Sequence, residues 1–310
     1  MKLSDIKRVL ILGSGTMGQQ IGFVCASRGY KVVLFDLSTE VLNDALKRIE
    51  SMGSWFVSTG RMKTEELSNA MKNIELASDP KQAALDVDFI SESLPENPEI
   101  KARVFAMFNE LCPTRTVFTT NTSTLVPSMF SDKTGRPEKF AALHFHDVRT
   151  CNIVDVMPHL GTAQEVVELV RDFAESLGQI VIMLRTENSG YVFNTMLSSL
   201  LNSALALVAN GVTSIEDVDR SWMGVMGMSI GPFGIMDQIG LSTVWTVTEY
   251  HASQTGDLQT QENAAFVKQY VDRGALGFKN MRGFYSYPNP AYSSPDFISG
   301  RKQKVNSIES

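Results

Sequence analysis

The stretch Arg8-Val-Leu-Ile-Leu-Gly13-Ser-Gly15-Thr-Met-Gly18 is followed by a second apolar run, Lys31-Val-Val-Leu-Phe-Asp36. The first run is too short for a buried helix and ends at glycine, which predicts a strand buried on both faces. Residues 17–28 have a helical pattern, and the second run predicts another strand. The stretch therefore predicts a strand, a tight turn, a helix and a second strand.

The three glycines of the turn have separate physical roles in such a unit. Gly13 is expected to form the tight turn, Gly15 to let backbone N–H groups approach a pyrophosphate, and Gly18 to let the helix pack closely on the sheet. Thr16 and Met17 lie where the helix begins, and the N-terminus of the helix would face the anion. These five positions are therefore candidate cofactor-binding residues.

Asp36 ends the second strand, 18 residues after the last glycine of the turn. An acidic side chain at this point accepts hydrogen bonds from the adenosine ribose and repels a 2′-phosphate. The sequence therefore predicts a site for NAD and a preference for NAD over NADP.

Composition limits the class of protein. A chain of 310 residues, 43% of them hydrophobic, is longer than one hydrophobic core usually needs, so we expect two domains. The net charge of −6 argues against general binding to nucleic acid or an anionic membrane. No apolar stretch approaches 18 residues and no signal-type segment is visible, so we expect a cytoplasmic protein. The cysteines are few and scattered, which indicates reduced thiols and no zinc site.

Strand and helix patterns alternate up to Leu184, after which long helical patterns continue without strands. We therefore expect an α/β domain over residues 1–186 and an all-α domain over residues 187–310. Further strands are expected at 74–76, 88–93, 116–120, 140–146, 152–157 and 179–184, and helices at 38–56, 63–71, 98–111 and 162–177.

His144 and His146 lie two residues apart on a predicted strand, so both should point to one face of the sheet. Asp155 on the next predicted strand could orient a histidine ring and stabilise its charged form, which favours a catalytic base. Asp147 offers His146 a partner of its own. A structural histidine stays open, whereas a metal site lacks a third ligand at a diagnostic spacing.

Two polar sites flank this strand in the sequence. Asn121 and Ser123 follow the predicted strand 116–120, at the sheet edge where ligands bind in open α/β folds, although such residues also serve as caps. Asn194 lies early in the first helix of the second domain. It forms either a helix-packing hydrogen bond or a contact to the cleft between the domains.

Taken together, motifs along nearly the whole chain resemble the L-3-hydroxyacyl-CoA dehydrogenase family in their order and spacing. They are Gly13-x-Gly-x-x-Gly18, Ser93-Leu-Pro-Glu-Asn97 with Lys101, Asn121-Thr-Ser, His144-Phe, Gly190-Tyr-Val-Phe-Asn194, Gly231-Pro-Phe-Gly-Ile-Met-Asp237 with Gly240-Leu, and Gly274-Ala-Leu-Gly-Phe-Lys279 with Gly283-Phe-Tyr.

The resemblance implies a Rossmann domain, a helical C-terminal domain that forms a homodimer, and NAD-linked oxidation of a 3-hydroxyacyl-CoA to the 3-ketoacyl-CoA. It implies that His144 is the base and that Ser123 and Asn194 bind the reacting oxygen. Glu96 and Lys101 match contacts near the nicotinamide ribose. To the cofactor site the resemblance also assigns Asn121.

The chain departs from the family at three places. The family usually reads His-Phe-Phe-Asn-Pro where this chain reads His144-Phe-His-Asp-Val148, and Asp155 replaces the glutamate that orients the base, one residue nearer to it. We still expect an Asp155 oxygen within about 3.2 Å of a His144 ring nitrogen. In the family, the helix that precedes the position of Gly60 commonly carries lysines that meet the CoA phosphates. In this chain the stretch 53–59 is uncharged, and the cations that flank it are Lys47, Arg48, Arg61 and Lys63.

The preferred hypothesis is an NAD-dependent 3-hydroxyacyl-CoA dehydrogenase. A dehydrogenase of a free 3-hydroxy acid, of the sugar-acid or carnitine type, is the first alternative. A catalytically silent NAD-binding protein is the second. The apolar helical segment over residues 189–285 is expected to form the dimer contacts.

Overall fold

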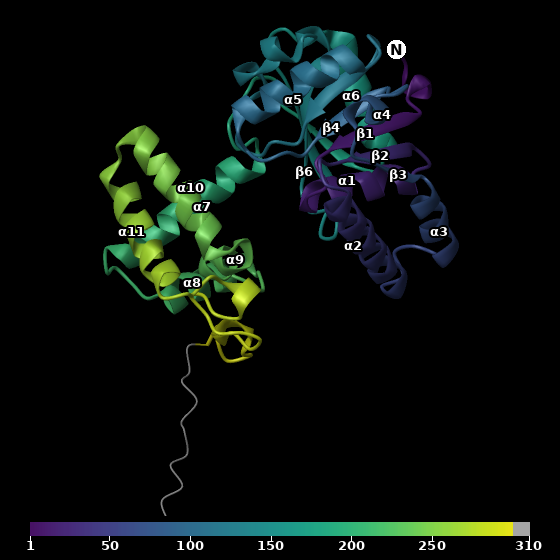
Figure 1. Cartoon of the computed structure of the whole chain (residues 1–310). Helices are drawn as coiled ribbons and strands as arrows, with labels where there is room; N and C mark the ends of the chain where they lie inside the picture. Colours follow the sequence, from purple (N-terminus) through teal and green to yellow (C-terminus); the bar gives the residue numbers. More distant parts are fainter. Residues whose placement is uncertain (300–310) are drawn as a thin grey trace, which may run out of the picture. The chain divides into compact units, whose positions relative to one another are not determined.

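A computed structural model of the protein describes residues 1–299, which form two compact units (Figure 1). Unit 1 spans Met1–Asn194 and unit 2 begins at Thr195, whereas the sequence predicts the boundary at 186–187. The segment after residue 186 stays with unit 1 because it is tied to a loop there. Ser128 N–H donates to Glu187 Oε1 at 2.6 Å, and Ser189 Oγ donates to the Thr124 carbonyl at 2.7 Å.

Unit 1 is built on an eight-stranded sheet in the order β3-β2-β1-β4-β5-β6-β7-β8. Neighbouring strands are parallel, except for the antiparallel pair β6 and β7. The chain adds β2 and β3 on one side of β1 and then crosses to β4 on the other, which is the Rossmann arrangement predicted from the sequence. The strands are β1 Arg8–Leu12, β2 Lys31–Phe35, β3 Ile74–Ala77, β4 Phe89–Glu92, β5 Val117–Thr120, β6 Phe140–Phe145, β7 Ile153–Pro158 and β8 Ile180–Met183.

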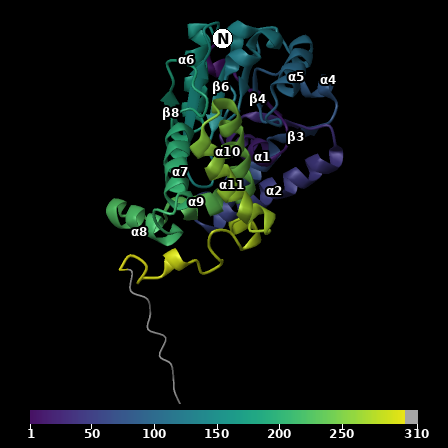
Figure 2. The ribbon, with the colours of Figure 1, turned by 90° about the vertical axis from the view of Figure 1, so that its left-hand side faces the viewer.

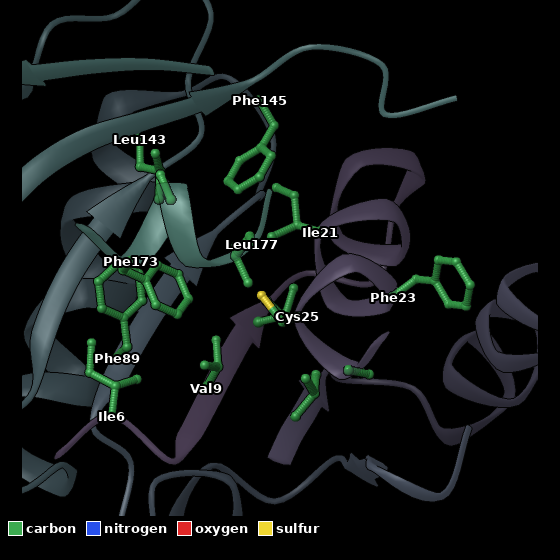
Figure 3. Close-up of a cluster of buried hydrophobic side chains, with 14 of the residues drawn as sticks. Ile6, Val9, Ile21, Phe23, Cys25, Phe89, Leu143, Phe145, Phe173 and Leu177 are labelled. Carbon is green, nitrogen blue, oxygen red and sulfur yellow. The ribbon is translucent and has the colours of Figure 1, made fainter. Parts of the chain in front are cut away.

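Helices cover both faces of the sheet, which explains why its strands are continuous apolar runs. Alternate residues of β1 supply the two cores: Val9 and Ile11 join one cluster, Leu10 and Leu12 the other. Figure 3 shows part of the first cluster, to which Val9 and Cys25 both belong. The first cluster includes side chains from α1 Thr16–Ser27, α2 Thr39–Ser58, α3 Thr64–Lys72 and α6 Gln164–Ser176, and the second from α4 Pro80–Ala83 and α5 Pro98–Leu111.

Side-chain caps mark where the helices α2 and α5 of unit 1 begin. Ser38 Oγ accepts from the Val41 N–H at 3.3 Å before α2, and Asn97 Oδ1 accepts from two N–H groups before α5. Proline follows at Pro98, where its missing N–H costs no intrahelical bond. The predicted bounds of α5 are confirmed at both ends.

Unit 2 is all-α, as the sequence predicts. Its core includes Leu205, Phe233, Met236, Leu241 and Val267. The helices α10 Leu241–Thr255 and α11 Leu258–Asp272 pack side by side (Figure 2). Within residues 1–299, none of the helices combines enough length and apolar character to span a lipid bilayer. The helices of unit 2 are α7 Phe193–Ala209, whose first two residues belong to unit 1, α8 Ile215–Met226, α9 Pro232–Ile239, α10 Leu241–Thr255 and α11 Leu258–Asp272.

Two fully buried carboxylates hold unit 2 together. Asp219 accepts hydrogen bonds from the N–H groups of Phe233 and Gly234, at the start of α9, and from the hydroxyl of Tyr285 at 3.0 Å. Asp237 accepts from the Tyr285 N–H at 2.9 Å. Burial raises the pKa of both carboxyl groups above the usual range. Both side chains therefore connect α9 to segments that are distant in sequence.

Candidate active site

A cavity of about 330 Å³ lies in unit 1 at the carboxyl ends of β4, β5 and β6. Parallel sheets of this kind bind ligands at that edge. Six of the lining residues belong to the predicted site, whereas Ser93, Leu94 and Phe145 were not predicted. The six are Met17, Glu96, Lys101, Asn121, Ser123 and His144.

The turn after β1 has the shape that a dinucleotide requires. Gly13 has a φ of +96°, and a Cβ at this residue would lie 2.7 Å from the Ser93 carbonyl oxygen. A Cβ on Gly18 would lie 1.9 Å from the Gly13 carbonyl oxygen, so helix and turn touch there. A Cβ on Gly15 would meet no atom within 4 Å. Side chains are thus excluded where the chain packs on itself, and space is left where a pyrophosphate would approach the N-terminus of α1.

Asp36 at the end of β2 is held against this turn. Its Oδ2 accepts from the Ser14 N–H at 3.1 Å and from Ser14 Oγ at 2.7 Å, and its Oδ1 accepts from the Leu37 N–H. A carboxylate has about four acceptor positions, so ribose hydroxyls can still be bound. Sequence reasoning missed Ser14, whose position inside the glycine motif was the available signal. The residues present fit NAD.

The histidine pair shares one buried carboxylate. His144 lies directly opposite Asp155 in the antiparallel register of β6 and β7, and its Nδ1 is 3.0 Å from Asp155 Oδ2. His146 Nε2 is 3.1 Å from the same oxygen, and the two rings lie edge to face. Burial opposes ionisation of Asp155, but the hydrogen bonds from the two histidines outweigh it and lower the pKa of this carboxyl. Both ring nitrogens therefore donate to Asp155.

Asp147 is not the partner that the sequence suggested for His146. The carboxylate of Asp147 accepts from the backbone N–H and the guanidinium of Arg149 in its own loop. A side chain two residues away can close such a loop locally, and Asp147 is therefore unavailable to the ring.

Tyr191 covers the other side of the His144 ring. The two rings stack with their centroids 4.6 Å apart, and Tyr191 is 1% exposed. Tyr191 also has a φ of +54°, a left-handed conformation that bulky residues rarely adopt and that concentrates at functional sites. The motif Gly190-Tyr-Val-Phe-Asn194 contains this residue, but its backbone conformation could not be read from the sequence.

Glu96 holds the loop that carries Ser123. Its Oε1 accepts from the N–H groups of Ser123 at 3.1 Å and Thr124 at 3.2 Å, while its Oε2 lies 3.3 Å from Lys101 Nζ. Burial opposes ionisation of Glu96, but the Lys101 ammonium and the hydrogen bonds from the Thr122 and Thr124 hydroxyls lower its pKa. Lys101 is 1% exposed and also binds Glu92 Oε1 at 2.6 Å. Sequence reasoning missed Glu92, which reads only as the end of a buried strand.

Asn121 and Asn194 are connected to the histidines by adjacent residues, Phe145 for Asn121 and Phe193 for Asn194. Asn121 Oδ1 accepts from the Phe145 N–H at 2.7 Å and so anchors the end of β6. Asn194 is in the first turn of α7, next to Phe193, whose ring contacts the His146 ring edge to face. The amide oxygen of Asn121 is thus used in the fold itself.

The four candidate cations for CoA are not brought into one cluster. Lys47 and Arg48 lie mid-way along α2, where both side chains bind Asp44. Arg61 lies beyond the end of that helix, with its guanidinium over the Trp55 ring and its Nη1 donating to the Arg149 carbonyl at 2.5 Å. The helix rises roughly 15 Å between Arg48 and its last residue, Ser58, at 1.5 Å per residue, and Arg61 lies beyond that end.

Lys63 stands at the N-terminus of α3, where its backbone N–H donates to Glu66 Oε2 at 2.7 Å. Trp55 and Arg149, which accompany Arg61, were not predicted. Both come from segments that meet only in the folded unit.

Comparison with known proteins gives the same fold and organisation. The NAD binding domain of 3-hydroxyacyl-CoA dehydrogenase matches residues 8–187, and the C-terminal domain of that enzyme matches residues 190–287. A 3-hydroxybutyryl-CoA dehydrogenase of Clostridioides difficile is 30% identical over 288 residues, covering 90% of this chain and 99% of the relative. A probable 3-hydroxybutyryl-CoA dehydrogenase of Bacillus subtilis is 28% identical, covering 91% and 98%.

Among solved structures, a diketoreductase described by its substrate-directed dual catalysis of dicarbonyl compounds is 35% identical to this chain. It matches with a TM-score of 0.84 and covers 91% of this chain and 99% of its own. The match to the NAD binding domain covers the glycine turn and the histidine pair, and the match to the C-terminal domain covers most of the helical unit. The chain belongs to the 3-hydroxyacyl-CoA dehydrogenase family of NAD-dependent oxidoreductases.

Proposed function

We propose that this protein oxidises an L-3-hydroxyacyl-CoA to the 3-ketoacyl-CoA reversibly, with His144 as the general base. The observation that carries the proposal is the buried pair of His144 Nδ1 and Asp155 Oδ2, 3.0 Å apart, beside a cavity that Ser123 also lines. The glycine turn adjoins this cavity through Met17 and Ser93.

The hydrogen bond to Asp155 determines which ring nitrogen can act. Because an ionised carboxylate only accepts, Nδ1 of His144 carries the proton, and Nε2 is left with the lone pair that takes the proton of a substrate hydroxyl. Asp155 then stabilises the charged ring. Ser123 and Asn194 are proposed to donate to the reacting oxygen and so fix the substrate carbon.

The cofactor is proposed to bind along the glycine turn. Gly13, Gly15 and Gly18 would admit the pyrophosphate, with Thr16 and Met17 at the helix N-terminus, and bound NAD supplies the hydride acceptor. Asp36 would bind the adenosine ribose. Glu96, Lys101 and Asn121 would keep the Ser123 loop and the end of β6 in place beside the nicotinamide end.

For the CoA phosphates, the contacts favour Arg61 among the four cations. Its guanidinium is held by Trp55 and by the 147–151 loop that directly follows His146. Lys47 and Arg48 are instead engaged with Asp44. Lys63 would assist from the start of α3. The half-exposed Trp55 ring with the Arg61 guanidinium over it can bind an adenine and a phosphate together.

A second candidate is a reductase of dicarbonyl compounds or a dehydrogenase of free 3-hydroxy acids without CoA. It is favoured by the 35% identity to the diketoreductase and by the lack of a cation cluster on α2. In this case the same base, His144, acts on a substrate that has no contact with Arg61.

One assay separates the candidates. NADH formation is measured with L-3-hydroxybutyryl-CoA and with free L-3-hydroxybutyrate, and NADH consumption with acetoacetyl-CoA and with a diketo ester. A higher kcat/KM for the thioesters, lost mainly through KM in Arg61→Ala, is the expected result. A higher kcat/KM for the diketo ester or the free acid, unchanged by Arg61→Ala, would establish the second candidate. Absence of turnover with all four would point to a silent NAD-binding protein.

We also propose that unit 2 forms a homodimer. Several apolar side chains of this unit are strongly exposed in the chain, among them Val225 at 82% and Leu258 at 73%. Exposed apolar side chains in this number are typical of an interaction surface. Sedimentation at micromolar concentration should give twice the mass of 34.2 kDa, and a monomer would contradict the proposal. The cytoplasmic location stays a prediction.

A further inference from the structure

The histidine pair and its acid form a three-ligand cluster that the sequence did not reveal. One nitrogen of His144, one nitrogen of His146 and one carboxylate oxygen of Asp155 all lie within 4.8 Å of one another. Two neighbouring histidines alone suggest no metal site because a third ligand is missing at the usual spacing. The antiparallel register of β6 and β7 supplies the third group.

The distances in the cluster suit a small transition-metal ion. Asp155 Oδ2 lies 3.0 Å from His144 Nδ1 and 3.1 Å from His146 Nε2. Ligands on a tetrahedral zinc with bonds of about 2.0–2.2 Å lie about 3.3–3.6 Å apart. Small rotations of the two rings would therefore admit the ion. Imidazole nitrogens favour zinc over magnesium or calcium.

The cluster can be approached from one side. The side chain of His146 is 17% exposed, whereas those of His144 and Asp155 are 6% and 2% exposed. An ion entering past His146 would replace the two ring N–H groups as the partner of Asp155. A water molecule would take the fourth coordination position of the ion. Two neutral rings and one carboxylate leave a single positive charge on the bound ion, which lowers the penalty of burying it.

We propose that this cluster binds Zn²⁺ and that bound zinc inhibits the enzyme. The inhibition, but not the binding, rests on the proposed role of His144 as the base. Zinc binds His144 Nδ1 and His146 Nε2 once the proton on each of these nitrogens has moved, through solvent, to the other nitrogen of its ring, so both rings stay neutral. In His144 the proton is then on Nε2. Nε2 then donates a hydrogen bond and cannot accept the proton of a substrate hydroxyl.

His146 is the residue that makes the site specific to this chain. His146→Phe removes one ligand and restores the residue usual in the family, while the His144–Asp155 hydrogen bond is retained. His251→Gln is the matched control, because His251 is an exposed histidine on α10 of unit 2. His146→Gln serves as a second variant if the phenylalanine variant does not fold.

The test measures metal binding and activity separately. Protein stripped with a chelator is dialysed against ZnCl₂, and Co²⁺ is used as a spectroscopic probe of nitrogen and oxygen ligands. We expect one Zn²⁺ per chain, a tetrahedral Co²⁺ spectrum, and binding more than about 10-fold weaker in His146→Phe but unchanged in His251→Gln. MgCl₂ should neither bind nor inhibit.

Activity is then titrated with ZnCl₂ at saturating cofactor. Inhibition should follow the dialysis curve and be lost in His146→Phe, which should retain turnover without metal. Zinc binding unchanged in His146→Phe, or no binding at millimolar ZnCl₂, would overturn the proposal. Site-specific binding without inhibition would overturn only the part that depends on His144 as the base.

Discussion

Asp155 in unit 1 and Asp219 in unit 2 are both almost fully buried carboxylates, yet their surroundings differ in kind. Asp155 accepts from the ring nitrogens of His144 and His146, and its pKa lies below the usual value. Asp219 accepts from two backbone N–H groups and a tyrosine hydroxyl, and burial raises its pKa.

The difference teaches that the partners, and not burial, decide what a buried acid does. A histidine can take up a proton, so an acid bonded to it can stabilise a charge that appears during a reaction. Backbone N–H groups stay neutral at any pH of interest, so an acid bonded to them fixes the position of two segments. Asp155 thus has the properties of a site residue and Asp219 those of a structural one.

The largest expected effect removes the titratable partner of Asp155. His144→Gln keeps a side chain that can donate to Asp155 but has no nitrogen able to accept a proton. Turnover should fall by about 10²–10⁴-fold, while the affinity for NAD, measured by fluorescence titration, stays the same. Turnover close to that of the parent protein would show that another group is the base.

The second effect is on stability and concerns Asp219. Asp219→Ala leaves the N–H groups of Phe233 and Gly234 buried without their acceptor. The free energy of unfolding should fall by about 2–4 kcal/mol. Asp272→Ala is the control, because it removes an exposed ion pair with Lys268 in the same unit and should change stability by less than about 1 kcal/mol. Urea denaturation followed by circular dichroism measures both.

Asp155→Asn tests the same acid without removing the base. The asparagine can still accept from His144, but it cannot stabilise a charged ring. Turnover should fall, but less than in His144→Gln because the base is kept, and the free energy of unfolding should change little. A loss of stability as large as that of Asp219→Ala, with turnover unchanged, would make Asp155 a structural acid as well.

Asp36 adds a third case to the comparison of Asp155 with Asp219, because its carboxylate contacts Ser14 of the glycine turn and, among residues 1–299, no titratable group. Asp36→Ala should weaken NAD binding by roughly tenfold and NADP binding much less, because the alanine no longer repels a 2′-phosphate. Isothermal titration with both cofactors measures the change. Equal binding of NAD and NADP by the parent protein would contradict the prediction.

The smallest expected effect is on the pH dependence of stability, to which two acids should contribute with opposite signs. The pKa of Glu96 is lowered from its usual 4.5, so its contribution to stability is present above that value and is lost as the pH falls through the lower folded pKa. The pKa of Asp219 is raised from 3.8, so its contribution is fully present below 3.8 and is lost as the pH rises through the higher folded pKa.

Unfolding free energies between pH 3 and 6 test this difference in Glu96→Gln and Asp219→Asn. The unfolding free energy of the parent protein minus that of Glu96→Gln should increase as the pH rises. The same difference taken against Asp219→Asn should decrease as the pH rises. Slopes of the same sign at both positions would show that burial alone governs these acids.

Local sequence was sufficient for the fold class. Apolar runs, glycine spacing and helix caps are properties of a few adjacent residues, and they predicted the order of strands and helices, with the bounds of α5 Pro98–Leu111 confirmed at both ends. Alternation along β6 also predicted that His144 and His146 share a face, opposite Leu143 and Phe145, which lie in the first core cluster. Backbone geometry alone enforces these patterns.

The contact of His144 with Asp155, at 3.0 Å, was expected from the sequence, but only the tertiary structure decided which other polar groups meet. The register of β6 against β7 places Asp155 between both histidines, Asp147 turns to Arg149, and Glu96 holds the Ser123 loop. Arg61 lies apart from Lys47 because α2 is one long helix. These contacts join residues distant in sequence and depend on strand pairing and side-chain packing, which no local pattern encodes.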